Sequence, residues 1–248
     1  MIEWDRVAEL YDIYVQSDID ISFFIRETRK VSGQVLELMA GTGRVSIPLL
    51  EAGVSLICVD ASEQMLAVLQ KKLAQKGLSA RIQQADVREL DLEECFELAI
   101  IPFNSFSELL SKKDQRNTLR SIHNHLREGG QLICTLHNPN VRSKLVDGSL
   151  RLEGKYSLGK EQLLFWGLEK QQQNHCIVER TQFYEIYDQH GFLQSKRLLN
   201  MHFCLIKKQE FEEMAQESGY KIVALYGDYS CAEFDSDTSL SMIFILEK

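Results

Sequence analysis

The sequence has no long apolar run and no dense cluster of basic residues. A membrane-spanning helix needs roughly 20 consecutive apolar residues, and no stretch of this chain approaches that length. The 28 Lys and Arg residues are outnumbered by 36 Asp and Glu residues and are spread along the chain. Proteins that bind a phosphodiester backbone need clustered basic side chains to displace counterions. We therefore expect neither a membrane nor a nucleic acid as partner.

Closely spaced cysteine pairs are also missing. The six cysteines form no C-x-x-C pair of the kind that binds zinc or carries redox chemistry. We expect reduced thiols and no metal site. The first six residues are acidic and amphipathic, which is unlike a secretory signal. A cytoplasmic protein is therefore expected.

The first half of the chain alternates short apolar runs with helical periodicity, which is typical of a parallel α/β sheet. Ser62 is a natural N-cap for a helix that Gly77 ends. A further helix is expected over residues 114–126, closed by Gly129 and Gly130. The first five strands are expected over residues 35–39, 54–59, 81–84, 98–101 and 131–136. A helix at 207–218 and strands at 221–226 and 241–246 complete the pattern.

The pattern changes after Asn138 and Pro139. Strands with period-two alternation are expected over residues 163–168, 176–187 and 192–206, joined by polar turns at 171–174 and 188–191. Strands joined by short turns pair antiparallel. The fold class is therefore α/β, a Rossmann-like, mostly parallel seven-stranded sheet with helices on both faces and an inserted antiparallel layer. The expected regions are an N-terminal helical cap (1–32), a cofactor-binding region (33–139), the insertion (140–206) and a final helix with two strands (207–248).

The glycine loop after the first strand is the sharpest feature. Gly41 and Gly43 allow the backbone to approach a ligand at the carboxyl end of a parallel strand. A dinucleotide fingerprint would need a third glycine where Ser46 stands, which counts against NAD. Glu37 lies between apolar residues of the strand, and burying a carboxylate there is costly unless it is bonded. Either Glu37 interacts with the loop and its ligand, or it is a solvated edge carboxylate.

Two further carboxylates end neighbouring strands. Asp60 lies 17 positions beyond Gly43, near the offset at which an acid binds ribose hydroxyls. Asp86 ends the third strand, where its carboxylate can accept from the exocyclic amine of adenine while Val87 packs on the ring. A lone Asp at a strand end is also a common turn former. The two acids together predict a site for an adenosine-containing ligand.

These motifs resemble those of class I S-adenosylmethionine-dependent methyltransferases. The resemblance rests on Glu-Leu-x-Ala-Gly-Thr-Gly-Arg at 37–44, Val-Asp-Ala-Ser-x-x-Met-Leu at 59–66 and Ala-Asp-Val at 85–87. The segments 96–105 and 126–132 resemble the strand before the family's acceptor site and the turn into its fifth strand. The resemblance covers residues 11–139 and 211–248. The family usually has Gly or Cys at the position of Ala40.

The resemblance implies S-adenosylmethionine as cofactor and a role for specific residues. Glu37 and the loop Ala40-Gly41-Thr42-Gly43 would hold the methionine portion, and Asp60 would bind both ribose hydroxyls. Ala61, Met65, Asp86 and Val87 would form the adenine pocket. The carbonyl of Pro102 or Phe103 would accept from the methionine amine, and Tyr11 would close over the cofactor. Arg26 would meet the methionine carboxylate or remain a solvated helix charge.

The insertion and the segment 225–229 resemble small-molecule N-methyltransferases of the amino-sugar and glycine-sarcosine type, some relatives of which methylate oxygen. This resemblance implies that the insertion shapes the acceptor site and a homodimer contact. His137 is the candidate base, or a residue that orients substrate or supports the structure. The candidate acceptor contacts are Asn104, Ser105, Phe106, Asn138, Trp166, Tyr184 and Tyr226. A nicotinamide-dependent oxidoreductase and a non-catalytic cofactor-binding module are the alternative functions.

Overall fold

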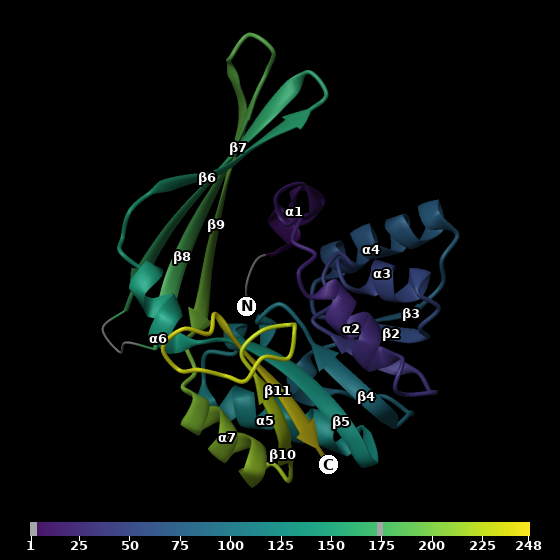
Figure 1. The fold of residues 1–248 in the computed structure, drawn as a ribbon. Coiled ribbons are helices and arrows are strands. Elements are labelled where there is room, and N and C mark those ends of the chain that lie inside the picture. Colours follow the sequence, from purple (N-terminus) through teal and green to yellow (C-terminus); the bar gives the residue numbers. More distant parts are fainter. Residues whose placement is uncertain (1–3, 173–175) are drawn as a thin grey trace.

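The computed structural model describes residues 4–172 and 176–248 and contains two sheets (Figure 1). The main sheet has seven strands in the order β10-β11-β5-β4-β1-β2-β3. The strands from β3 to β5 run parallel, whereas β11 is antiparallel to both of its neighbours. The strand bounds are Val35–Leu38 (β1), Leu56–Asp60 (β2), Arg81–Gln84 (β3), Phe96–Ile101 (β4), Leu126–His137 (β5), Lys221–Tyr226 (β10) and Ser241–Glu247 (β11).

Helices cover both faces of this sheet, as predicted. One face packs on α5 (Lys112–Asn124) and α7 (Lys208–Glu217), and the other on α2 (Ile21–Thr28), α3 (Ser46–Glu51) and α4 (Glu63–Lys76). Along β1, Leu36 and Leu38 join the first core and Val35 joins the second. Because side chains alternate along a strand, Glu37 points toward the face that α2, α3 and α4 cover. The predicted fold class is confirmed.

Local signals set most of the element boundaries. The Ser62 hydroxyl accepts from the Met65 backbone N–H at 3.1 Å and caps α4, which ends at Gly77 in the left-handed conformation. The prediction was wrong at Gly129 and Gly130, which lie inside β5 rather than between a helix and a strand. The helix α5 ends before them, at Asn124, and β5 begins with a short segment that pairs with Phe96.

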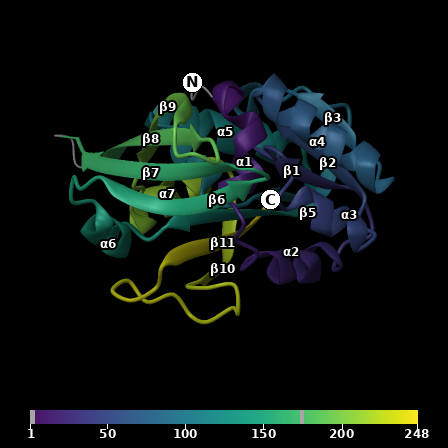
Figure 2. The same cartoon turned by 90° about the horizontal axis from the view of Figure 1, so that it is seen from above.

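The insertion is a four-stranded antiparallel sheet that rises above the main sheet (Figures 1 and 2). Its strands are β6 (Arg151–Leu158), β7 (Glu161–Gln171), β8 (Ile177–Tyr187) and β9 (Leu193–Cys204). Sequence reasoning missed β6, whose alternate residues are exposed or half-buried and carry a weak apolar pattern. The short helices α6 (Pro139–Arg142) and η4 (Ser143–Leu145) lead into it. Part of the expected turn 171–174, together with His175, lies outside the described residues.

The N-terminal segment packs between the two sheets. It forms a short helical turn, η1 (Trp4–Arg6), followed by α1 (Ala8–Tyr14). Val7 and Leu10 pack with Leu163, Phe165 and other apolar residues on one face of the insertion sheet. In Figure 1 this segment lies between the insertion and the strand ends of the main sheet. It therefore lies where a cover for a ligand at those ends would be.

Candidate functional site

A pocket of about 390 Å³ opens at the carboxyl ends of β1, β2 and β3. Its volume is in the range of small-molecule and cofactor sites. Five carboxylates and one guanidinium are among its lining groups. Nine of its lining residues had no role in the sequence prediction: Trp4, Asp5, Met39, Ser62, Arg88, Glu108, Leu109, Leu110 and Asp114. The other eight were predicted: Tyr11, Gly41, Asp60, Ala61, Met65, Asp86, Val87 and Ser105.

The glycine loop at the end of β1 needs residues that tolerate positive φ. Met39, Gly41 and Gly43 have φ of 57°, 57° and 84°. At Gly41 a Cβ would meet no atom within 4 Å, so the open space beside this backbone belongs to the pocket. At Gly43 a Cβ would lie 2.3 Å from Leu69 Cδ1 of α4. The two glycines therefore serve different purposes, one facing the pocket and one allowing α4 to pack closely.

Asp60 connects the end of β2 to this loop. Its Oδ2 accepts from the Gly41 N–H at 2.8 Å, and its Oδ1 accepts from the Ser62 N–H at 2.8 Å. Burial raises the pKa of this carboxyl, and the backbone N–H donors oppose that rise. A carboxylate has about four acceptor positions, so these backbone donors leave acceptor capacity for a ligand. Asp60 is thus held in place by the backbone and still open toward the pocket.

Glu37 lies buried behind the glycine loop. Its side chain is 1% exposed, and among the described residues neither carboxylate oxygen has a hydrogen-bond partner. Burial raises its pKa to about 7. A buried carboxylate without a partner is costly, so this position fits a group that interacts with a cationic ligand or with water in the loop. The alternative of a solvated edge carboxylate is wrong.

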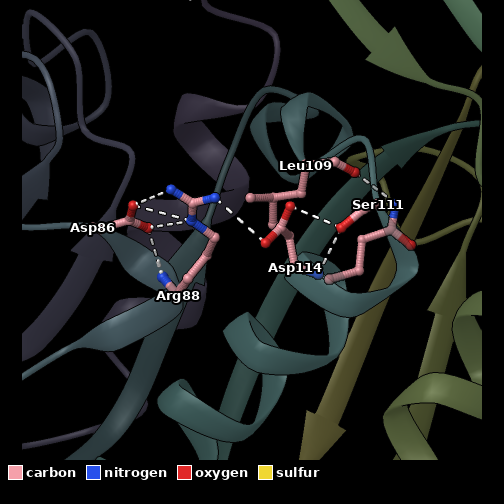
Figure 3. Close-up of polar contacts among 6 residues, drawn as sticks. Asp86, Arg88, Leu109, Ser111 and Asp114 are labelled. Atoms are coloured by element: carbon pink, nitrogen blue, oxygen red, sulfur yellow. Dashed lines mark hydrogen bonds and ion pairs between the residues drawn. The ribbon is translucent and has the colours of Figure 1, made fainter. Parts of the chain in front are cut away.

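Asp86, Arg88 and Asp114 form a chain of ion pairs at the rim of the pocket (Figure 3). The Asp86 carboxylate accepts from the Arg88 side chain, with Nε 2.9 Å from Oδ1 and Nη2 2.5 Å from Oδ2, and from the Arg88 backbone N–H. Arg88 also reaches Asp114 of α5 at 3.3 Å, and Asp114 accepts from the Ser111 hydroxyl. The Arg88 guanidinium lowers the pKa of Asp86. Asp86 is therefore ionised and oriented, and Arg88 already donates to both of its carboxylate oxygens.

The chain after β4 makes a second sharp turn at the strand ends. Phe103 and Asn104 have φ of 57° and 62°, and positive φ at non-glycine residues tends to cluster at functional sites. The Pro102 carbonyl already accepts from the Ser105 N–H and hydroxyl, and the Phe103 ring lies under the Arg44 guanidinium at 4.2 Å. Ser105 begins η3 (Ser105–Glu108) and lines the pocket. Phe106, in contrast, is fully buried against Phe211 and belongs to the core.

Tyr11 and Glu108 both contact Trp4, on the side of the pocket that the N-terminal segment covers. Tyr11 projects from α1, packs edge-to-face on Trp4 and lines the pocket. Burial raises the pKa of its phenol. The Glu108 carboxylate accepts from the Trp4 indole N–H at 3.3 Å, and burial raises the pKa of Glu108 to about 7. Sequence reasoning missed Glu108 because a Glu in a polar turn gives no signal of burial.

Several predicted cofactor residues support the loop without lining the pocket. Thr42 is fully buried, and its hydroxyl donates to Asp12 of α1 at 2.6 Å, which ties the loop to the N-terminal segment. Ala40 is buried beside it. Arg26 lies half exposed on α2, where it contacts Glu27 and Cys231. The structure therefore does not bring Arg26 to this pocket.

Most predicted acceptor residues lie away from this pocket. His137 at the end of β5 packs on the Phe203 ring, and burial lowers its pKa to about 4. The buried Asn138 caps α6 and donates to the carbonyls of Ser236 and Ser239. The backbone N–H of Asn104 donates to the Thr135 hydroxyl, whereas its side-chain Oδ1 is buried and has no hydrogen-bond partner among the described residues. None of the three is among the described residues that line the pocket.

The same holds for the three predicted aromatic contacts. Tyr184 is fully buried in the insertion sheet, and its hydroxyl bonds to Tyr14 and Gln182. Trp166 donates to Glu185 across β7 and β8. Tyr226 ends β10 and packs on the core that α2, α3 and α4 cover. Thus the structure gathers the predicted cofactor residues better than the predicted acceptor residues.

The described residues fit S-adenosylmethionine. The glycine loop leaves open space beside its backbone, Asp60 keeps acceptor capacity for ribose hydroxyls, and the Asp86 carboxylate lines the same pocket. The carboxylate-rich lining suits a ligand that carries a sulfonium and an ammonium. Glu37 does not line the pocket and lies behind the loop, where the nearby Ser46 hydroxyl opposes the rise of its pKa. No helix among the residues described is long and apolar enough to cross a membrane.

Comparisons with known proteins agree with this geometry. Residues 35–130 match the model of a methyltransferase domain family. The chain is 26% identical to the glycine/sarcosine N-methyltransferase of Halorhodospira halochloris over 255 residues, which cover 99% of this chain and 86% of that protein.

Solved structures show the same fold. An S-adenosylmethionine-dependent methyltransferase from Clostridium acetobutylicum superposes with a TM-score of 0.82 at 18% identity, over 98% of each chain. The sugar N-methyltransferase KedS8 from a Streptoalloteichus species superposes with a TM-score of 0.77 at 16% identity, over 96% of this chain and 91% of that one. The alternative of a nicotinamide-dependent oxidoreductase receives no support. The chain is an enzyme of the S-adenosylmethionine-dependent methyltransferase class.

Proposed function

We propose that this enzyme transfers the methyl group of S-adenosylmethionine to an amine nitrogen of a small molecule. The observation that carries the proposal is the likeness to a glycine/sarcosine N-methyltransferase across 99% of the chain, insertion included. The carboxylate-rich pocket supports it, because five acidic side chains favour a cationic amine over a neutral alcohol. Methyl transfer needs mainly an in-line approach of the nitrogen lone pair, and positioning of this kind can contribute roughly 7–11 kcal/mol.

In this proposal, different residues at the strand ends bind different parts of the cofactor. Asp60 binds the ribose hydroxyls and Asp86 accepts from the adenine amine, while Val87 and Met65 pack on the ring. Glu37 and the loop at Gly41 and Gly43 hold the methionine portion. The bound cofactor supplies an activated methyl group. The protein then has to orient the amine and exclude water, and Tyr11 and Trp4 cover the pocket on that side.

We further propose a cytoplasmic enzyme that forms a homodimer through the insertion. The six cysteines are free, which suits a reducing compartment. The face of the insertion sheet opposite Tyr184 carries an apolar row that crosses all four strands: Leu152, Trp166, Phe183 and Leu198. Leu152 and Leu198 are more than 40% exposed. A second copy related by a two-fold axis would cover this row with its own. Phe183→Lys should then turn a dimer into a monomer in sedimentation experiments.

The test of the reaction uses matched acceptors. The enzyme is incubated with methyl-labelled S-adenosylmethionine and pairs that differ only at the nucleophile, such as glycine and glycolate, or an amino sugar and its hydroxyl counterpart. The proposal predicts label in at least one amine and in none of the hydroxyl partners. Label in an alcohol with none in its paired amine would contradict it.

A further inference from the structure

We propose that Glu108 binds the ammonium group of the acceptor and takes one proton from it, so that this carboxylate selects an amine as substrate. The inference rests on the proposed function and adds the residue that recognises the nucleophile.

The position of Glu108 in the fold supports this role. It ends η3, the turn that follows β4, and β4 lies on the side of β1 away from β2 and β3. Asp60 ends β2 and Asp86 follows β3, and their carboxylates are assigned to adenosine. The turn η3 contacts both β5 and strand β9 of the insertion. Glu108 therefore lies where the cofactor pocket meets the insertion sheet.

The hydrogen bonds of Glu108 leave room for a ligand. Its Oε2 accepts from the Trp4 indole at 3.3 Å, and its side chain lines the pocket. This differs from Asp86, whose carboxylate is neutralised by Arg88. Among the described residues, the ionisable groups that act on Glu108 are the Asp60 carboxylate from β2 and the Tyr11 phenol from α1, and neither carries positive charge. No described cationic side chain neutralises this carboxylate, so it can accept a cationic ligand.

The titration of Glu108 fits proton uptake. Burial and the Asp60 charge raise its pKa to about 7, and a base works best when its pKa lies near the working pH. The acceptor R–NH₃⁺ gives one proton to Glu108 and becomes R–NH₂. The nitrogen lone pair then forms the bond to the methyl carbon, and the carbon–sulfur bond breaks with its electron pair left on sulfur. Glu108 returns its proton to solvent after the methylated ammonium leaves.

Binding of sinefungin tests the proposal without turnover. Sinefungin carries an ammonium-bearing carbon in place of the methyl-bearing sulfonium, whereas S-adenosylhomocysteine has an uncharged thioether there. Calorimetry measures the affinities for sinefungin, S-adenosylhomocysteine and S-adenosylmethionine in the wild type and in Glu108→Gln, which keeps the shape and removes the charge. We expect Glu108→Gln to weaken sinefungin binding about tenfold, since a hydrogen bond to a charged group is lost. S-adenosylhomocysteine affinity should change less than about threefold, which also shows that the variant is folded.

The exposed Glu89, next to this pocket but not among its lining residues, gives the control Glu89→Gln, which should leave both affinities unchanged. The wild-type preference for sinefungin should also fall between pH 8 and pH 5.5 as Glu108 becomes protonated. An unchanged preference in Glu108→Gln overturns the inference. An equal loss of affinity for sinefungin and for S-adenosylmethionine also overturns it, because Glu108 would then interact with the sulfonium of the cofactor. If the wild type binds neither S-adenosylhomocysteine nor sinefungin, the proposed function itself fails.

Discussion

The strand ends of the main sheet and the insertion both contain buried polar groups, but they satisfy them differently. At the strand ends, backbone N–H groups and single partners hold Asp60 and Glu108 and leave acceptor positions facing the pocket. In the insertion, charged side chains satisfy one another. Arg180 pairs with both Glu153 and Glu169, and Glu169 also accepts from Arg142.

This difference separates groups that await a ligand from groups that stabilise the fold. A carboxylate fixed by backbone donors is already oriented, so a ligand can use its free acceptor positions at little further cost. A carboxylate in an ion-pair network, such as Asp86 beside Arg88, has less of this capacity, and losing one member of a network leaves charge uncompensated. Substitutions in the insertion should therefore lower mainly stability, whereas substitutions at the strand ends should lower mainly ligand affinity.

The largest effect is expected for Arg180→Ala in the insertion. The change leaves Glu153 and Glu169 with less positive charge in a site where the Arg180 side chain is 18% exposed and that of Glu169 10%. Breaking a buried pair costs about 3–5 kcal/mol, and partial exposure places this one at the lower end. Thermal unfolding should show a clearly lower Tm, while S-adenosylmethionine affinity measured below that temperature stays within about twofold. A large loss of cofactor affinity in the folded variant would show that this network also contributes to binding and would contradict the comparison.

The pH dependence of stability should report on His137. Burial lowers its pKa to about 4 from an ordinary value of 6.5, so the unfolded chain binds the extra proton more readily. The contribution of neutral His137 is present above about pH 6.5 and is lost as the pH falls toward 4, by at most roughly 3 kcal/mol. His137→Phe should flatten the fall of Tm between pH 7 and pH 4.5. An equally steep fall in the variant would show that His137 is not responsible.

Asp60→Ala should affect binding more than stability. It removes the acceptor assigned to the ribose and the support of the Gly41 N–H. A hydrogen bond to a charged group contributes about 1.5–3 kcal/mol, so calorimetry should show at least a tenfold loss of S-adenosylmethionine affinity. The surface variant Glu51→Ala serves as control. Unchanged affinity in Asp60→Ala would remove the ribose assignment.

The smallest effect is expected at the adenine end. Asp86→Ala should lower the affinity for S-adenosylhomocysteine several-fold, up to about tenfold, and should have little effect on an analogue that lacks the 6-amino group. Arg88→Ala should show the same selectivity with a smaller change, because Arg88 only orients Asp86 (Figure 3). Equal losses for the two ligands would mean that Asp86 supports the turn and does not contact the amine.

The sequence predicts the main sheet well because its signals are local. The Ser62 cap, the turn at Gly77 and the apolar strands each depend on neighbouring residues, and parallel strands then bring Gly41, Asp60 and Asp86 to one edge. The partners of side chains are not local. Arg88 reaches Asp114 over 26 positions, and Trp4 reaches Glu108 over 104. For the same reason sequence reasoning places Tyr184 at a substrate, whereas its hydroxyl bonds to Tyr14.

Calorimetry of the wild-type protein with S-adenosylmethionine and with NAD tests the central claim most directly, because both ligands place an adenosine at the same strand ends. The carboxylate-rich pocket and Ser46 in place of a third glycine predict measurable binding of S-adenosylmethionine and no binding of NAD at the same concentrations. Tighter binding of NAD than of S-adenosylmethionine would contradict the assignment of this pocket.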